Sequence, residues 1–354
     1  MPDTNIADTN IVARRYFETV ESGESVASTP PVCLYLEVTN RCNLLCETCP
    51  RTFEDLEPPM DLSMEMFTRI VDQVPNVKRV VLHGVGEPML VKHLPDMIRY
   101  LKRRSGVHVL FNTNGTLLAP KKQREIIETG LDELRVSLDA AEAATFLQVR
   151  GKDMFDRIVR NVSSFTNLQK AIGAEKPLVS LWLTGLKETV DQLPDFVRLA
   201  ARIGVKEVHL QRLVFDSAGF GMARSESSLF EQTRADEEAV IANAAALGQS
   251  LGVMLDASGA TEPGISLKRQ SDDKPWSMCR RPWSLMYFTA HGTALPCCIA
   301  PFSERGYENY TLGNASKQDL AEIWNGPAYR DFRSALMSDT PPKPCQGCGL
   351  RWSL

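Results

Sequence analysis

The sequence predicts an α/β fold: a partial (β/α)6 barrel of the TIM type, followed by a small C-terminal domain made of a β-hairpin and a helix. From residue 33 to residue 256, short runs of β-branched and large apolar residues alternate with segments of helical periodicity. Such alternation favours parallel βαβ units. The pattern ends in a Gly-, Ser- and Pro-rich segment at 257–277, and a hairpin signal follows it.

Seven short runs have the composition of buried strands. They are 33–38, 79–83, 107–111, 134–138, 178–183, 207–213 and 253–256. Six segments between them place apolar residues at helical spacing. They are 64–74, 92–104, 120–129, 153–170, 188–203 and 230–250. This number of repeats favours a full or partial barrel, and a doubly wound sheet is the alternative.

The chain therefore divides into three parts. Residues 1–31 are polar with one short amphipathic stretch, so we expect a leader that is mobile or packs on the surface. Residues 32–260 form the barrel. Residues 261–354 form the C-terminal domain, in which a hairpin turns at 291–292 and one helix covers 317–337.

The composition excludes several classes of protein. The 354 residues are 43% hydrophobic and 24% charged, which is typical of a globular chain of about two domains. A net charge of −4 gives no electrostatic reason to expect a nucleic-acid partner. No apolar run approaches the roughly 20 residues of a membrane span, and the N-terminus lacks the apolar core of a signal peptide. We therefore expect a cytoplasmic protein with no nucleic-acid or membrane partner.

Nine cysteines are clustered along the chain, which in a reducing cytoplasm favours metal binding over disulfides. Cys42, Cys46 and Cys49 form a C-x3-C-x2-C motif after the first predicted strand, where chemistry gathers in parallel β/α folds. Three thiolates can hold three irons of a 4Fe–4S cluster and leave the fourth iron open to another ligand. Zinc is the alternative, but it needs a fourth ligand, and the nearest histidine, His83, lies on another strand.

A second set of cysteines lies in the C-terminal domain. Cys279 and Cys297 form C-x17-C, and Cys345 and Cys348 form C-x2-C. Four thiolates would close a metal site completely. Spacing alone allows zinc as readily as an iron–sulfur cluster.

The segment TNRCNLLCETCPR resembles the cluster loop of the radical S-adenosylmethionine (SAM) superfamily. In that family the open iron binds the amino and carboxylate groups of SAM, and reductive cleavage of SAM gives a 5′-deoxyadenosyl radical that abstracts a hydrogen atom from the substrate. HGVGEP at 83–88 is similar to the Gly-Gly-Glu-Pro loop of the family. Thr48 departs from the pattern, because the family often has an aromatic residue there against adenine. The resemblance covers residues 33–354.

The resemblance also implies which residues contact SAM. Glu87 would pair with the ammonium group and Arg150 with the carboxylate. Ser137 and Asp139 would bond the ribose hydroxyls, and Gln211 would meet the adenine edge. The complete set of expected SAM contacts is Gly86, Glu87, Asn112, Asn114, Ser137, Asp139, Arg150 and Gln211.

The C-terminal segments CRRPWSLMYFTAHGTALPCC and CQGC resemble the SPASM extension of radical SAM enzymes, or its shorter, twitch form. The resemblance implies that Cys279, Cys297, Cys345 and Cys348 hold one auxiliary 4Fe–4S cluster. The one-cluster arrangement is similar to that of the alcohol-oxidising radical SAM dehydrogenases of aminoglycoside biosynthesis.

Two cysteines remain outside both sets. Cys298 is either a buried thiol or a hydrogen-atom donor to a substrate radical, as in radical SAM epimerases. Cys33, at the start of a strand, is expected in the core, where a thiol behaves as a small hydrophobe.

The resemblance predicts a radical SAM enzyme that oxidises or epimerises an alcohol carbon of a polar small molecule, with the auxiliary cluster as electron acceptor. Flavodoxin or ferredoxin would supply the electrons for SAM cleavage. A general base would help the hydroxyl proton leave. His83 and Glu37 lie near predicted strand ends, but neither is assigned this role.

Two other functions stay open. The first alternative is a maturase that modifies a ribosomally made peptide, although residues 1–31 are short for a peptide-recognition domain. The second alternative is an iron–sulfur or zinc scaffold without catalytic activity. Glu87 and Arg150 argue against a scaffold, because an electron carrier does not need a SAM site.

Overall fold

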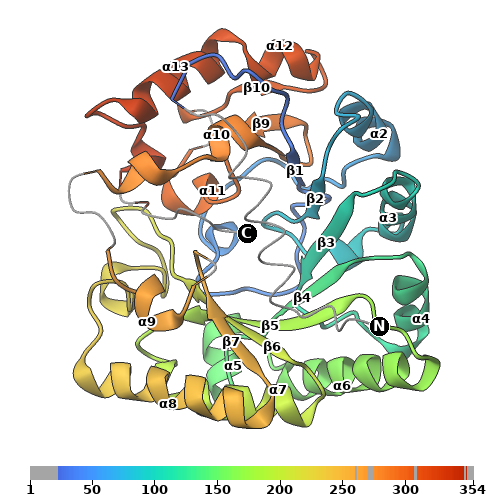
Figure 1. Ribbon diagram of the computed structural model, residues 1–354, viewed down its shortest axis with the longest axis vertical. Coiled ribbons are helices and arrows are strands. Elements are labelled where there is room, and N and C mark those ends of the chain that lie inside the picture. The colour runs from blue at the N-terminus through green and yellow to red at the C-terminus, as the bar shows by residue number, and fades with distance from the viewer. Residues whose placement is uncertain (1–22, 260, 270–273, 307–308, 347, 349–354) are drawn as a thin grey trace.

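The computed structural model describes residues 23–259, 261–269, 274–306, 309–346 and 348 (Figure 1). Strands and helices alternate through the first two thirds of the chain, as predicted. Its strands are β1 (Cys33–Leu36), β2 (Arg79–Leu82), β3 (His108–Thr113), β4 (Glu133–Ser137), β5 (Leu178–Gly185), β6 (Glu207–Arg212) and β7 (Met254–Ala257). Its helices are α2 (Met64–Asp72), α3 (Leu94–Lys102), α4 (Pro120–Glu128), α5 (Ala143–Arg150), α6 (Phe155–Ile172), α7 (Leu193–Arg202) and α8 (Ala235–Leu251).

The C-terminal part is built from short elements. Its strands are β8 (Leu285–Phe288), β9 (Thr293–Leu295) and β10 (Gly313–Asn314). Its helices are α9 (Pro263–Ser266), α10 (Arg281–Ser284), α11 (Ala300–Ser303), α12 (Leu320–Trp324) and α13 (Pro327–Met337). The predicted hairpin is confirmed, because β8 and β9 pair antiparallel on either side of Gly292, whose φ of 77° suits glycine.

The ten strands of the described residues form one sheet in the order β10-β9-β8-β1-β2-β3-β4-β5-β6-β7. Strands β1 to β7 pair in parallel with their neighbours in sequence, and helices cover the outside of the curved sheet (Figure 1). The predicted partial barrel is therefore confirmed. The sequence did not reveal that β8 pairs in parallel with β1, so that the C-terminal hairpin continues the barrel sheet.

Two helical predictions need correction. The single helix over 317–337 is wrong: α12 ends at Trp324, and α13 begins at Pro327. Proline lacks the N–H that would continue α12, and its fixed φ suits the first position of a new helix. Helix α5 was not predicted, because its apolar side chains do not form one stripe: Phe146 and Val149 are buried, whereas Leu147 is 47% exposed.

The start of the described chain lies against the C-terminal helices. Trp324 donates its indole N–H to the carbonyl of Thr29 at 2.8 Å, and the amide of Ala27 donates to Asn325 at 2.9 Å. Arg333, which is fully buried, donates to the carbonyl of Ser25. The expected amphipathic stretch lies outside the described residues, and the boundaries at 31/32 and 260/261 stay predictions.

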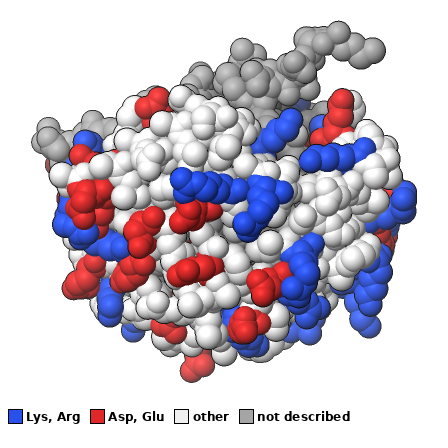
Figure 2. Space-filling view, turned by 90° about the horizontal axis from the view of Figure 1, so that it is seen from below, with Lys and Arg blue, Asp and Glu red and all other residues white. Residues whose placement is uncertain are grey.

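The outer surface carries charges of both signs. Figure 2, which views the molecule of Figure 1 from below, shows Lys and Arg interspersed with Asp and Glu. Over the described part of the chain, the helices are all too short or too polar to span a lipid bilayer.

The interior of the barrel has two different halves. Beside β1 and β8 it is apolar, as is usual for a parallel barrel. This apolar half contains Cys33, Tyr35, Val81, Leu110, Leu285 and Tyr287. Beside β4, β5 and β6 it contains Arg135, Trp182 and His209, all of them buried.

Glu37 joins the barrel to the C-terminal hairpin. Its carboxylate accepts hydrogen bonds from the amide of Val85 at 2.9 Å, the hydroxyl of Tyr287 at 3.2 Å and the amide of Ala290 at 3.3 Å. The side chain is 1% exposed, and burial raises its pKa to about 7. A Cβ at Gly84 would lie 2.2 Å from the Glu37 side chain, so glycine is needed there.

The substitution Glu37→Gln tests this junction through the pH dependence of stability. The pKa of Glu37 is about 7 in the folded chain and 4.5 ordinarily, so the folded state binds this proton more tightly. The stabilisation is present below pH 4.5 and is lost as the pH rises through 7. Between pH 5 and pH 8, the wild-type free energy of unfolding should fall by about 2 kcal/mol more than that of the variant.

Anaerobic urea unfolding at both pH values measures this difference. Glu65→Gln, which removes an exposed carboxylate at the start of α2, is the matched control and should follow the wild type. Equal pH dependence in wild type and Glu37→Gln would contradict the prediction.

Candidate functional site

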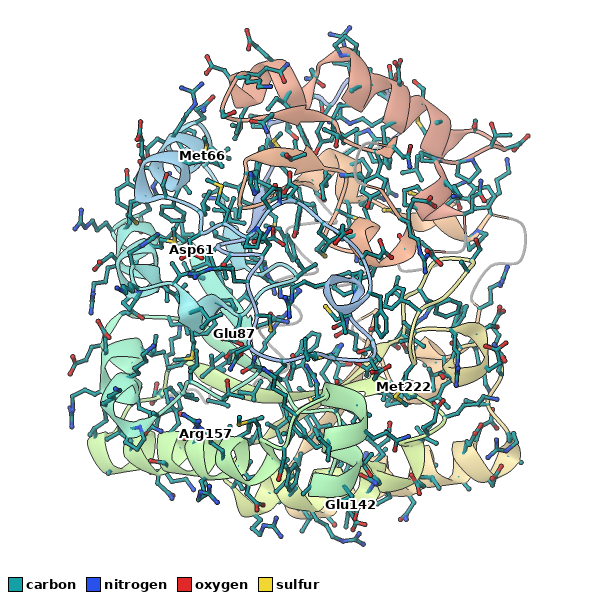
Figure 3. All side chains as sticks on the ribbon, turned by 180° about the vertical axis from the view of Figure 1, so that it is seen from behind. Asp61, Met66, Glu87, Glu142, Arg157 and Met222 are labelled. Atoms are coloured by element: carbon teal, nitrogen blue, oxygen red, sulfur yellow. The ribbon has the colours of Figure 1, made fainter. Side chains whose placement is uncertain are left out.

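A cavity of about 190 Å³ lies at the carboxyl ends of β1 to β6. This is where parallel β/α folds place their chemistry. Figure 3 labels Glu87 close to the loop that follows β1. The expected residues that line the cavity are Cys42, Cys46, Cys49, Gly86, Glu87, Asn112, Asn114, Ser137, Asp139, Arg150, Gln211 and Cys298.

The cysteine loop is bound directly to the segment after β2. The amide of Glu87 donates to the carbonyl of Arg41 at 2.8 Å. A Cβ at Gly86 would lie 2.1 Å from the carbonyl oxygen of Thr39 and 2.7 Å from that of Arg41. Only glycine permits this approach of two backbones, so Gly86 sets the position of the three cysteines.

Side chains from two other elements reach the cysteines themselves. Asn114, after β3, places its Nδ2 3.9 Å from Cys42 Sγ and 2.8 Å from Asn43 Oδ1. Arg150, at the end of α5, places its Nη1 3.5 Å from Cys46 Sγ. These donors face the sulfur atoms that would hold a cluster.

Glu87 is buried and already engaged. Its carboxylate accepts hydrogen bonds from Thr113 Oγ1 at 2.7 Å, the amide of Asn114 at 2.6 Å and the amide of Met89 at 3.0 Å. Burial raises its pKa, and these hydrogen bonds act in the opposite direction. An ammonium group that binds Glu87 would therefore contact carboxylate oxygens that already accept hydrogen bonds from residues after β2 and at the end of β3.

Arg150 and Asp139 form an ion pair, with 2.5 Å between Nη2 and Oδ2. Asp139 also accepts the amide of Thr184 at 2.6 Å, and its φ of 62° is unusual for a residue other than glycine. Within the described chain, Arg150 Nε and Asn112 Oδ1 are buried without a hydrogen-bond partner. Such atoms in a cavity wall indicate a missing polar ligand.

These features fit the expected cofactors. Three thiols on one loop suit the three protein ligands of an open 4Fe–4S cluster. Unpartnered donors and acceptors beside them suit the polar groups of SAM. Among the described side chains, no three of His, Cys, Asp and Glu converge to hold a single metal ion. A cluster binds each thiolate to a different iron, so it does not need such convergence.

The second set of cysteines lies around a buried arginine. Arg281 is 4% exposed, and although burial lowers its pKa, the thiols of Cys298, Cys297, Cys279 and Cys348 raise it above its ordinary value. The amide of Cys348 also donates to the carbonyl of Cys345 at 3.0 Å. A buried guanidinium needs anionic neighbours, which four thiolates on a cluster would provide.

A stack of three side chains in the polar half of the barrel was not predicted. The ring of His209 stacks on Trp182 at 3.8 Å, and the guanidinium of Arg135 lies 4.6 Å from the ring of Trp182. Both aromatic residues line the cavity. His209 lies two residues before Gln211 in β6, so both side chains are on the same face of the strand, and this spacing is the signal that could have identified it.

The two candidate general bases differ in position. His83 lines the cavity, and burial lowers its pKa to about 4, with Arg135 acting in the same direction. It is therefore neutral at pH 7, and its low pKa makes it a weak base there. Glu37 is not among the residues that line the cavity, and its carboxylate joins the barrel to the hairpin.

Two family profiles match this chain. The profile of the radical SAM superfamily matches residues 36–200, and that of the SPASM iron–sulfur cluster-binding domain matches residues 279–349. These domains imply two 4Fe–4S clusters and SAM as cofactors.

Curated relatives cover most of the chain at low identity. The tungsten-containing aldehyde ferredoxin oxidoreductase cofactor-modifying protein of Pyrococcus furiosus is 27% identical, over 90% of this chain and 87% of its own. The PqqA peptide cyclase of Gluconobacter oxydans is 26% identical, over 90% and 83%. The Fe-coproporphyrin III synthase of Methanosarcina barkeri is 26% identical, over 81% and 72%.

Solved structures share the fold. Streptococcus suis SuiB bound to S-adenosylmethionine superposes with a TM-score of 0.65 at 17% identity, covering 86% of this chain and 68% of its own. The protein anSMEcpe with bound AdoMet gives 0.62 at 16% identity, covering 87% and 81%.

The substitution Gly86→Ala should displace the cysteine loop, because the new Cβ would overlap the carbonyl of Thr39. We expect a stability loss of at least about 1–3 kcal/mol and reduced iron at the three-cysteine site. Iron and sulfide analysis with EPR of the reduced protein measures the second effect. Gly264→Ala is the control, because a Cβ there meets nothing within 4 Å. Full iron content in Gly86→Ala would disprove the role of this contact.

Proposed function

Because the chain belongs to the radical SAM superfamily and carries a C-terminal SPASM iron–sulfur cluster-binding domain, we propose that it is a maturase that modifies a peptide side chain by hydrogen-atom abstraction. One observation carries the catalytic part of the proposal: the three-cysteine loop, the SAM-contact residues and Cys298 line a single cavity. When bound, SAM and the cluster supply a 5′-deoxyadenosyl radical that takes a hydrogen atom from the substrate.

The residues of this chain would bind and orient the reactants. Cys42, Cys46 and Cys49 would hold three irons of the cluster. The unpartnered Arg150 Nε would donate a hydrogen bond to SAM, and the unpartnered Asn112 Oδ1 would accept one. Gln211, exposed inside the cavity, would meet its adenine edge. We propose the same residue roles for Gly86, Glu87, Asn114, Ser137 and Asp139 as the resemblance implies.

The comparisons support a peptide substrate better than a small alcohol. Relatives that match most of this chain include several PqqA peptide cyclases. SuiB, which shares the fold, was solved bound to the precursor peptide SuiA. Oxidation or epimerisation of a small-molecule alcohol remains the second candidate, because the cavity wall contains His83, a nitrogen base within reach of a bound substrate.

The first test is SAM cleavage. Anaerobically reconstituted protein with dithionite should release 5′-deoxyadenosine, and the triple variant Cys42→Ala/Cys46→Ala/Cys49→Ala should not, while its iron falls from about eight to about four atoms. Cys33→Ala, which removes a buried thiol outside both sets, is the control. Absence of 5′-deoxyadenosine from the fully loaded wild type would leave only a scaffold function.

The substrate class is tested by isotope transfer. Deuterated peptides and deuterated polyols are offered separately, and deuterium in 5′-deoxyadenosine identifies the compound from which hydrogen was taken. Transfer from polyols alone would contradict the peptide proposal. If a flavodoxin or a ferredoxin can replace dithionite in this assay, that protein is the candidate physiological reductant. The cytoplasmic location of the protein stays a prediction.

Cys298 is proposed to return a hydrogen atom to the substrate radical in a redox-neutral reaction. The thiol would lose its hydrogen atom, and one electron and one proton from an external reductant would restore it. In D2O the wild-type product should gain one deuterium, and the product of Cys298→Ser should not. Iron analysis checks that the auxiliary site is intact in the variant. A product without solvent deuterium in the wild type would exclude this role.

A further inference from the structure

Among the side chains that hold the segment from Cys42 to Cys46 from outside it, three carry positive charge: Arg51, Arg150 and Lys152. Asn114 and Arg150 face the sulfur atoms, as described above. Arg51 Nη2 donates to the carbonyl of Leu44 at 2.8 Å. Lys152 Nζ donates to the carbonyl of Asn43 at 2.7 Å.

Arg51 and Lys152 are bonded to backbone carbonyls and not, among the described residues, to a carboxylate. No ion pair within 4.0 Å is formed by either side chain in the described parts of the chain. Other cations near the loop are neutralised: Arg41 pairs with Asp61, and Arg305 pairs with Asp216 at 2.6 Å. The two cations without a described carboxylate partner are therefore those that bond the carbonyls of Asn43 and Leu44, between Cys42 and Cys46.

Arg51 also lies within charge range of two of the thiols. Burial raises the pKa of Cys49 to about 12, and Arg51 acts in the opposite direction on both Cys49 and Cys42. Glu87 opposes it at Cys42. Both side chains are partly buried, so solvent screens their charges less than it would on an open surface.

An iron–sulfur cluster on three thiolates gains negative charge when it is reduced. Its reduction potential depends on net charge and on hydrogen bonds around the sulfurs. We propose that Arg51 and Lys152 are positioning residues that raise the reduction potential of the cluster held by Cys42, Cys46 and Cys49. The inference rests on the cluster assigned to this site, and it assigns the electrostatic tuning to two residues that are not among those lining the cavity.

The test is a redox titration followed by EPR on the reconstituted full-length chain. The spectrum of the triple cysteine variant is subtracted, so that the signal of this cluster is followed alone. For Arg51→Gln, the ratio of reduced to oxidised cluster at a fixed potential should fall about tenfold, which equals a shift of about 59 mV for one electron. Lys152→Gln should shift the ratio in the same direction, and the double variant should shift it further.

Two further variants separate charge from structure. Arg51→Lys keeps the charge and should restore most of the wild-type ratio. Lys121→Gln removes an exposed lysine in the first turn of α4 and should change nothing. A wild-type ratio in Arg51→Gln with full iron content would overturn the inference. Loss of iron without a shift in the remaining cluster, unrescued by lysine, would also overturn it and leave a purely structural role.

Failure of the proposed function is a separate result. Absence of SAM cleavage in the wild type would remove the enzymatic proposal, whereas the titration would still report the effect of both charges on the cluster.

Discussion

The close contact between the cysteine loop and Gly86 fixes the rest of the site. Two backbone segments that are far apart in sequence meet there without an intervening side chain, and the amide of Glu87 bonds the carbonyl of Arg41 across the contact. The carboxylate of Glu87 then reaches Thr113 and Asn114 at the end of β3. One residue therefore aligns the cysteine loop with two strand ends, and a displacement at any of them would move the others.

The pairing of β8 with β1 places the auxiliary site beside the same cavity. Because β8 continues the barrel sheet, the chain that follows the hairpin brings Cys298 into the cavity wall. Glu37 reinforces this pairing through Tyr287 and Ala290. The C-terminal part thus completes the wall on the side that β1 leaves open, and its cysteines are held at a fixed position relative to the first set.

Local signals were enough to predict the strands and most helices, because each has its own periodicity or composition. The three-cysteine motif and the loop at 83–88 were recognisable for the same reason, since each lies within a few consecutive residues. Features that depend on distant residues were not predictable. The β8–β1 pairing, the Arg150–Asp139 ion pair and the stack on Trp182 each join segments whose sequences carry no sign of the partner. The break before Pro327 has a local signal, the proline itself, but the helical periodicity on both sides of it predicts a single helix.

Charge is arranged differently in the cavity wall and around the cysteine loop. In the wall, Arg150 is paired with Asp139, so a ligand carboxylate that binds Arg150 would share this cation with Asp139. The amino-acid end of SAM carries such a carboxylate, and the proposed roles place its ammonium group at Glu87. Around the loop, Arg51 and Lys152 are not balanced by any described carboxylate, which suits a ligand of net negative charge. Arg150 belongs to both regions, because it contacts Cys46 and Asp139 together. Its position would therefore couple the charge of the cluster to the binding of the SAM carboxylate.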